Sequence, residues 1–280
     1  MYTDNKVKEM VKEKYSEIAK QSKTENETSC CGAGCGCGTV DYAVMADNYT
    51  SLEGYFADAD LGLGCGLPTE FADIKKGDTV VDLGSGAGND AFVARHIVGD
   101  DGRVIGIDMT DTMIELARKN AAKLNLQNVE FRLGDIENIP LSNNRADVVV
   151  SNCVLNLVPD KLRVFSEIYR ILKPGGHFTI SDIVLEGELP AAIVKEAEMY
   201  AGCVSGAIQK SDYLNFITQN GFKNISLHKE KQIIIPEEIL SKYLNTDQLQ
   251  EFKNSGLGIF SITVSAEKTK DCGCSPACCN

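Results

Sequence analysis

The sequence is poor in histidine, in long apolar runs and in positive charge, and each shortage excludes a class of protein. Its 280 residues include three histidines, none with a partner at the spacing of a metal site, so we expect all three to be structural. They are His96, His177 and His228. No run approaches the ~18 apolar residues of a membrane-spanning helix. Residues 1–10 are polar and charged, and we therefore expect no signal peptide.

The charge balance is acidic: 40 acidic residues against 28 basic ones leave a net charge of −12. Such a surface repels both nucleic-acid phosphates and anionic lipid headgroups, so we expect no nucleic acid and no membrane as partner. We expect a cytoplasmic protein. The hydrophobic content of 43% is that of an ordinary globular chain, long enough for one large α/β domain and a smaller appendage.

Eleven cysteines are the unusual feature of the composition. Eight lie in two glycine-rich clusters, Cys30–Cys37 and Cys272–Cys279, while Cys65, Cys153 and Cys203 stand singly. An odd number without an export signal favours reduced thiols over a disulfide scaffold. The spacing of the first cluster is not that of a zinc finger or ribbon. Capture of a soft ion and an inert flexible loop both remain open for it.

The stretch from Val80 to Asp90 organises the chain. It predicts a short buried strand that runs into a tight turn, with a helix following. The turn contains Gly84, Gly86 and Gly88, which lack a Cβ and let a ligand lie against the backbone. The free N–H groups at the start of the helix would face that ligand.

A second predicted strand, Arg103–Asp108, ends in an acid at the place where a carboxylate holds the two hydroxyls of a ribose. Asn89 stands where a dinucleotide-binding loop has its third glycine, so the pattern favours a single nucleoside. After the third predicted strand, Asp135 is placed to accept from an exocyclic amine such as that of adenine, with Ile136 against the ring.

Strands and helices alternate through the middle of the chain, which predicts a mostly parallel sheet with ligands beyond its carboxyl ends. Helices are expected over residues 91–98, 111–125 and 160–173, and further strands over 128–133, 146–151 and 178–184. After residue 186 the pattern predicts helices over 189–200, 211–220 and 236–245 and strands over 221–231 and 257–266. The last two strands are expected to extend the sheet as an antiparallel pair. Residues 5–21 predict an amphipathic helix that packs on the core.

The glycine loop resembles the S-adenosylmethionine site of the Rossmann-like methyltransferases, and four further stretches make the resemblance specific. With Asp82–Asp90, the runs Gly62–Pro68, Gly106–Thr110, Ser151–Leu157 and Gly202–Ala207 resemble the arsenite methyltransferases, most closely their prokaryotic form. The resemblance implies S-adenosylmethionine as cofactor. It also implies a set of cofactor-binding residues: Asp82, Gly84, Ser85, Gly86, Gly88, Asp108, Met109, Asp135, Ile136 and Asn152.

The cysteine contexts imply the substrate. By position, Cys153 and Cys203 resemble the thiolates that hold trivalent arsenic, and Cys65 resembles a third thiolate delivered by a mobile loop. The family's N-terminal cysteine matches Cys31 or its neighbour Cys30. Soft sulfur ligands suit trivalent arsenic, whose lone pair can attack the methyl carbon of a sulfonium without a general base. The implied partners are arsenite, methylated arsenicals and a thiol reductant such as glutathione or thioredoxin.

We therefore expect an α/β chain with a Rossmann-like class I methyltransferase sheet, a small C-terminal substrate-side cap and Cys-rich flexible ends. Residues 1–45 would form the N-terminal helix and Cys-rich segment, and 46–185 the cofactor domain. Residues 186–267 would complete the sheet and the arsenic site, and 268–280 would be a Cys-rich tail.

Two other functions compete with arsenic methylation. A small-molecule C-methyltransferase of the quinone-biosynthesis type shares the glycine loop, but it leaves the three single cysteines unexplained. A thiol-rich soft-metal binding protein would use the two terminal cysteine clusters as its working parts.

Overall fold

The structure is a computed structural model that describes residues 4–21, 48–188, 206–234, 237–241, 244–254 and 258–270. The two cysteine clusters, Cys203 and the helix expected over 189–200 lie outside these residues. No described helix is long and apolar enough to cross a membrane.

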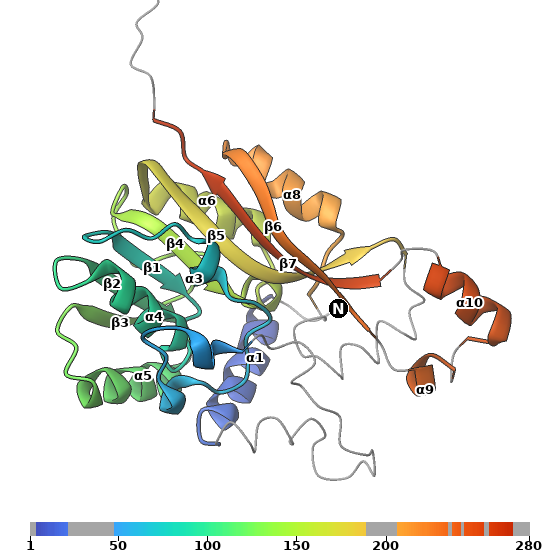
Figure 1. The fold of residues 1–280 in the computed structure, drawn as a ribbon, viewed down its shortest axis with the longest axis horizontal. Coiled ribbons are helices and arrows are strands. Elements are labelled where there is room, and N and C mark those ends of the chain that lie inside the picture. The colour runs from blue at the N-terminus through green and yellow to red at the C-terminus, as the bar shows by residue number, and fades with distance from the viewer. Residues whose placement is uncertain are drawn as a thin grey trace, which may run out of the picture.

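One seven-stranded sheet forms the centre of the described structure, in the order β3-β2-β1-β4-β5-β7-β6 (Figure 1). Strands β1 to β5 pair in parallel, whereas β7 lies antiparallel between β5 and β6. The predicted parallel sheet with an antiparallel pair at one edge is therefore confirmed. The strands are β1 Thr79–Leu83, β2 Arg103–Asp108, β3 Val129–Leu133, β4 Ala146–Asn152, β5 Leu172–Glu186, β6 Lys223–Ile233 and β7 Gly258–Glu267.

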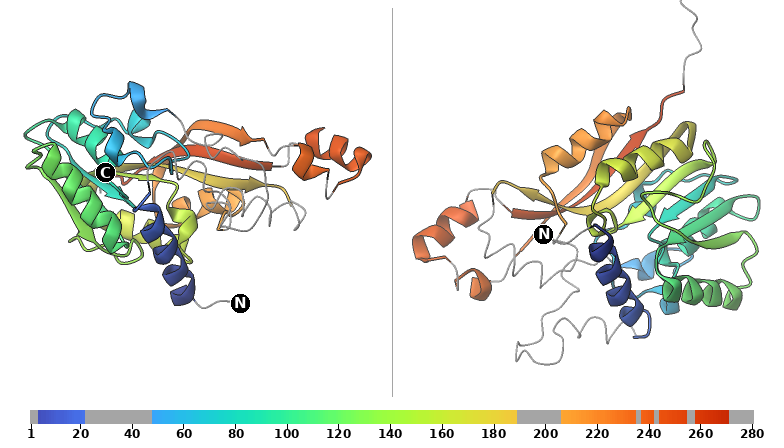
Figure 2. Two further views of the ribbon diagram at one scale, coloured as in Figure 1. Left: turned by 90° about the horizontal axis from the view of Figure 1, so that it is seen from below. Right: turned by 180° about the vertical axis from the view of Figure 1, so that it is seen from behind.

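Helices cover both faces of the sheet, as the two views in Figure 2 show. On one face, α4 and α5 contribute Phe92 and Met113 to a cluster of buried residues. On the other face, α6 and α8 contribute Phe165 and Tyr213 to a second cluster. The helices are α1 Asp4–Ile18, α3 Pro68–Phe71, α4 Asn89–Val98, α5 Asp111–Lys123, α6 Lys161–Ile171, α8 Lys210–Gln219, α9 Glu237–Leu240 and α10 Thr246–Asn254. Short 3-10 turns are η2 Tyr49–Ser51, η3 Ala57–Ala59 and η4 Leu155–Leu157.

The prediction of one helix over residues 236–245 is wrong in its bounds. The structure has a short α9 there and a separate α10, which was not expected. The backbone N–H of Gln248 donates to the Asn245 side chain at 2.9 Å, and the Gln248 side chain accepts from the Asn245 N–H at 3.0 Å. This reciprocal cap starts α10, because it satisfies two N–H groups that a helix start leaves open.

Strand β5 also differs from its prediction, since it begins at Leu172 rather than Phe178. The pairing of β4 with β5 shifts register between Ala146 and Val148, so the Lys173–Gly176 stretch is accommodated inside the strand. Gly175, with a φ of +86°, donates its N–H to Lys268 at 2.6 Å, and this bond ties the stretch to the end of β7.

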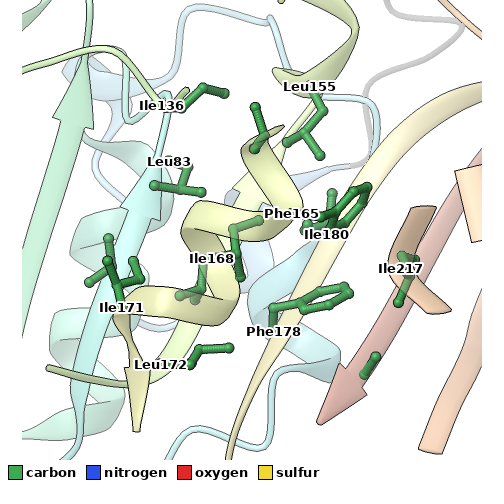
Figure 3. Packing of buried hydrophobic residues seen from close by; sticks show 14 of the residues in the cluster. Leu83, Ile136, Leu155, Phe165, Ile168, Ile171, Leu172, Phe178, Ile180 and Ile217 are labelled. Atoms are coloured by element: carbon green, nitrogen blue, oxygen red, sulfur yellow. The ribbon is translucent and has the colours of Figure 1, made fainter. Parts of the chain in front are cut away.

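Aromatic side chains fill the face of the sheet under α6 and α8. Phe165 of α6 is fully buried, and its ring lies 5.7 Å from the ring of Phe178 and 5.4 Å from that of Tyr213. Figure 3 shows part of this cluster, in which α6 lays Phe165 and Ile168 against β5. The packing of these rings holds α6 and α8 to the sheet.

We expect Phe165→Ala to lower the free energy of unfolding by about 3–5 kcal/mol, because it leaves a cavity beside the rings of Phe178 and Tyr213. Leu162→Ala on the same helix is the matched control, since Leu162 is 38% exposed, and its loss is expected to stay below about 1 kcal/mol. Denaturant unfolding of the two variants measures the difference. Equal losses would show that the aromatic cluster does not hold this layer.

Candidate active site

A pocket opens where β1, β2 and β4 end, at the edge where the sequence places its candidate residues. It is lined by nine of the ten predicted cofactor-binding residues and by Cys153: Asp82, Gly84, Ser85, Gly86, Asp108, Met109, Asp135, Ile136 and Asn152. The tenth, Gly88, lies behind the turn. A Cβ on Gly88 would fall 2.8 Å from the Phe92 ring, so this glycine serves the packing of α4.

The glycine turn is held to the next strand by its own backbone. The N–H groups of Gly84 and Ser85 both donate to the carbonyl of Ile107, at 2.7 and 3.0 Å. Gly84 has a φ of +69°, and a Cβ there would fall 2.3 Å from the Val154 side chain. A side chain at this position would therefore push β1 and β4 apart at the pocket.

Asp108 joins the glycine turn to the start of α5. Its Oδ2 accepts from the Gly86 N–H at 3.0 Å, and its Oδ1 accepts from the Thr110 N–H at 2.8 Å. Burial raises the pKa of Asp108, although these backbone hydrogen bonds oppose the rise. The carboxylate is thus fixed in direction at the pocket wall.

Asp82 and Asp90 place two more carboxyl groups in the same wall. Burial, followed by the charges of Asp90 and Asp108, raises the pKa of Asp82 well above its usual value. Burial raises the pKa of Asp90 to about 6, against hydrogen bonds from Tyr49 and Asn152 that lower it. Oδ2 of Asp82 and Oδ1 of Asp90 are buried without a hydrogen-bond partner in the described structure. These two oxygens are acceptors that a cationic ligand would satisfy.

Helix α1 contributes to the pocket as well as to the core. Tyr15 packs against the α4 and α5 side of the core, which confirms the predicted packing role, and Val11 and Tyr15 also line the pocket. Lys8 of α1 forms an ion pair with Asp135 at 2.6 Å and also pairs with Glu137. The predicted adenine acceptor, Asp135, is therefore held by α1.

Two of the predicted arsenic ligands meet beside this pocket. Cys65 and Cys153 are 2% and 3% exposed and belong to one apolar cluster with Ile183 and Ile259. Cys153 follows β4 with a φ of +60°, a conformation that is strained for a residue with a side chain. Cys203 and Cys31 lie outside the described residues.

Two residues of the site were missed in the sequence. Tyr49 lies in η2, and its hydroxyl donates to Oδ2 of Asp90 at 2.9 Å. Asp90 is the last residue of the glycine motif. The sequence could have indicated it, because it is an acid in the first turn of a helix that is mostly buried. Tyr49 stands in a stretch with no periodic pattern, so only the fold reveals it.

The three histidines bond to protein groups. A ring nitrogen of His96 contacts the Glu53 carboxylate, and one of His177 contacts the Ala72 carbonyl. A ring nitrogen of His228 contacts the Ser265 hydroxyl. Within the residues that the structure describes, no group of three or more histidine, cysteine or acidic side chains could hold a metal ion.

The chain matches a family model described as a methyltransferase domain over residues 74–229. It is also similar to the crystal structure of an arsenic(III) S-adenosylmethionine methyltransferase from Chlamydomonas reinhardtii. The TM-score is 0.61 at 33% identity, and the match covers 81% of this chain and 74% of that one.

Two curated relatives have the same activity in their names. An arsenite methyltransferase of Halobacterium salinarum is 42% identical over 277 residues, which covers 93% of this chain and 66% of the relative. An arsenite methyltransferase of Aquipseudomonas alcaligenes is 36% identical over 188 residues, covering 65% of this chain and 54% of the relative. The chain thus spans just under two thirds of the first relative's length and about half of the second's.

The raised pKa of Asp90 predicts a pH-dependent stability. The folded protein holds this proton up to about pH 6, whereas the unfolded chain releases it near pH 4. Stability is therefore lost as the pH rises through this window, by at most about 3 kcal/mol. We expect Asp90→Asn to reduce that slope in unfolding measurements between pH 4 and 7, and Asp82 and Asp108, whose pKa values burial also raises, to keep part of it. Asp101→Asn, at an exposed aspartate, should keep the full slope; an equally steep slope in Asp90→Asn would contradict the assignment.

Proposed function

Because this chain belongs to the arsenite methyltransferases, a family built on the methyltransferase domain, we propose that it transfers a methyl group from S-adenosylmethionine to trivalent arsenic held by its cysteines. The observation that carries the proposal is the burial of Cys65 and Cys153 in one cluster, with Cys153 in the wall of the pocket. Two soft ligands thus stand beside a pocket formed by the glycine turn.

The pocket residues fit the cofactor by charge. S-adenosylmethionine carries an ammonium and a sulfonium, and its methyl group on that sulfonium is the electrophile. Asp82 and Asp90 each present a buried oxygen without a partner, and an ammonium would satisfy either one. A cation in this place would also offset the repulsion among the buried carboxyl groups of Asp82, Asp90 and Asp108.

We assign the nucleoside end of the cofactor to the other end of the pocket. Asp108, fixed by Gly86 and Thr110, would accept from the two ribose hydroxyls. Met109 and Ile136 would enclose the adenine ring, and Asp135 would face its amine. Asn152 is part of the proposed cofactor wall, and its amide is already engaged by the loop that carries Cys65.

Cys153, Cys203 and Cys65 would bind arsenite as three thiolates, which leaves a pyramidal arsenic with one lone pair. That lone pair attacks the methyl carbon in line with the bond to the leaving sulfur. Arsenic carries no proton to remove, so the residues act by position and hold the reacting atoms about 3–3.5 Å apart. A monomethylated arsenical has two remaining sites for thiolates, so under this proposal Cys65 is needed for the first methylation only.

The electron balance calls for a thiol partner. Forming the arsenic–carbon bond uses the lone pair and leaves arsenic pentavalent, so a second methylation requires two electrons. Two thiols supply them by forming a disulfide, and an external thiol such as glutathione or thioredoxin then reduces the enzyme, with Cys31 or Cys30 as the exchanging residue. We place the reaction in the cytoplasm, where thiols stay reduced, and its role in arsenic detoxification.

The two competing functions are less favoured. A C-methyltransferase of the quinone-biosynthesis type has no use for two thiols buried at the donor pocket. A soft-metal binding protein would depend on the terminal cysteine clusters, which leaves the carboxylate-lined pocket without a purpose. Removing both clusters, Cys30–Cys37 and Cys272–Cys279, would abolish the function of such a protein, but would spare methylation of arsenic that is already bound to thiols.

The proposed function predicts that purified protein with arsenite, S-adenosylmethionine and a thiol reductant forms mono- and dimethylated arsenicals. Chromatography with elemental detection measures them. Cys153→Ser and Cys203→Ser should each abolish product from every arsenic species, because two thiolates are needed in both steps. Replacing the four tail cysteines with serine is the matched control and should preserve turnover. Absence of product from the unmodified chain would overturn the proposed function.

The ribose assignment predicts that Asp108→Ala weakens cofactor binding by about 10- to 100-fold, through the loss of hydrogen bonds to a charged acceptor. Isothermal titration with S-adenosylhomocysteine measures the affinity. The control is Asp101→Ala, in the exposed turn that precedes β2. This variant is expected to bind the cofactor product as tightly as the unmodified chain. Unchanged affinity in Asp108→Ala would place the ribose elsewhere.

A further inference from the structure

The backbone at Cys65 and Gly66 is fixed by side chains from three distant parts of the chain. The Cys65 N–H donates to Oδ1 of Asn152 at 3.0 Å, and the Cys65 carbonyl accepts from the Ser261 hydroxyl at 2.6 Å. The Gly66 carbonyl accepts from the Asn152 amide at 2.8 Å and lies 3.1 Å from the Tyr49 hydroxyl, whose single proton is shared between this carbonyl and Asp90. The loop that carries Cys65 is thus held at three consecutive peptide groups.

Asp90 is the common partner of Tyr49 and Asn152, two of the three side chains that hold the loop. Its Oδ2 accepts from the Tyr49 hydroxyl at 2.9 Å and from the Asn152 amide at 3.2 Å. The Asn152 amide also contacts the Tyr49 hydroxyl. All three side chains are buried or half-buried, so each hydrogen bond is made away from competing water.

The glycines on either side of Cys65 allow the loop to approach the sheet closely. A Cβ on Gly64 would fall 2.7 Å from the Asn152 amide nitrogen, and a Cβ on Gly66 would fall 2.5 Å from the Ser181 hydroxyl. The loop backbone therefore lies directly against β4 and β5. Hydrogen bonds at this contact set where Cys65 stands relative to Cys153.

We propose that Tyr49, through Asp90 and Asn152, is a positioning residue that holds Cys65 beside Cys153 for the first methyl transfer to arsenite. The role of the three thiolates rests on the proposed function, whereas the holding of the loop rests on the contacts alone. Tyr49 also lines the pocket, and the proposed role belongs to its hydroxyl, which acts through the loop.

The Tyr49 hydroxyl stays protonated and can donate a hydrogen bond, and one substitution removes it without changing the ring. Burial and the charge of Asp90 raise the pKa of Tyr49 well above its usual value, so the hydroxyl remains a donor. Its ring packs with Leu67 and Val93. Tyr49→Phe keeps that packing and deletes only the hydroxyl.

The first test measures how fast the Cys65 thiol is alkylated, and it does not depend on methyl transfer. Full-length Tyr49→Phe and the unmodified chain are treated with iodoacetamide, and alkylation of Cys65 is followed by peptide mass spectrometry. We expect the Cys65 rate to rise about tenfold, because the loop loses a buried hydrogen bond that keeps it closed. Tyr213→Phe is the matched control, since it also deletes a buried tyrosine hydroxyl that donates to an aspartate, at 3.3 Å from Asp182, and should leave the rate unchanged.

The second test separates the two methylation steps. In Tyr49→Phe, kcat/KM for arsenite should fall about tenfold, while kcat/KM for a monomethylated arsenical and the affinity for S-adenosylhomocysteine should change by less than about twofold. A purely structural role would lower both steps alike, and equal losses would overturn the proposal. If Tyr49→Phe does not fold, Asp90→Asn carries the alkylation measurement alone, because Asp90 also lines the cofactor pocket, and an unchanged Cys65 rate in that variant would overturn the proposal.

The outcomes separate this inference from the proposed function. If the unmodified chain methylates arsenite and Tyr49→Phe leaves Cys65 alkylation unchanged, the positioning role fails and the function stands. If the unmodified chain forms no methylated arsenic, the function fails. The alkylation rates still decide whether Tyr49 holds the loop, and an unchanged rate overturns that role too.

Discussion

Hydrogen bonds from the Asn152 side chain join two parts of the site that lie 86 and 87 positions apart in the sequence. The amide binds the peptide groups on both sides of the Cys65–Gly66 bond, and the next residue after Asn152 is Cys153. The strand end that carries one thiol therefore also sets the position of the other. Together with the bonds from Tyr49 and Ser261, this contact fixes the loop before β1 against the end of β4, so that the two buried thiols lie in one site.

The antiparallel edge of the sheet belongs to the same arrangement. Ser261 of β7 donates to the Cys65 carbonyl, and the Ser181 hydroxyl of β5, which lies against Gly66, bonds to Thr263 of β7 at 2.8 Å. The predicted division at residues 185 and 186 falls inside β5, which continues to Glu186 and pairs with β7 from His177 to Glu186. The C-terminal strands therefore support the thiol loop as well as the sheet edge.

The pocket lowers the stability of the fold because it buries three carboxyl groups. Asp82, Asp90 and Asp108 face one another at the ends of β1, α4 and β2, and each has a raised pKa because burial penalises its charged form. A protein selected only for stability would not gather three carboxyl groups in its interior. A pocket that receives a cationic ligand can use all three, because the ligand supplies the missing opposite charge.

The alternating strands and helices, the glycine turn and the acids at strand ends were readable from the sequence, because each depends on local periodicity and on the conformational freedom of glycine. Asp82, Asp108 and Cys153 could be placed on one edge for the same reason, since parallel strands bring their carboxyl ends together. The contact of Cys65 with Asn152, the role of Tyr49 and the pairing of Lys8 with Asp135 came only from the tertiary structure. These contacts join residues from 41 to 127 positions apart, and no local pattern specifies which distant side chains will meet.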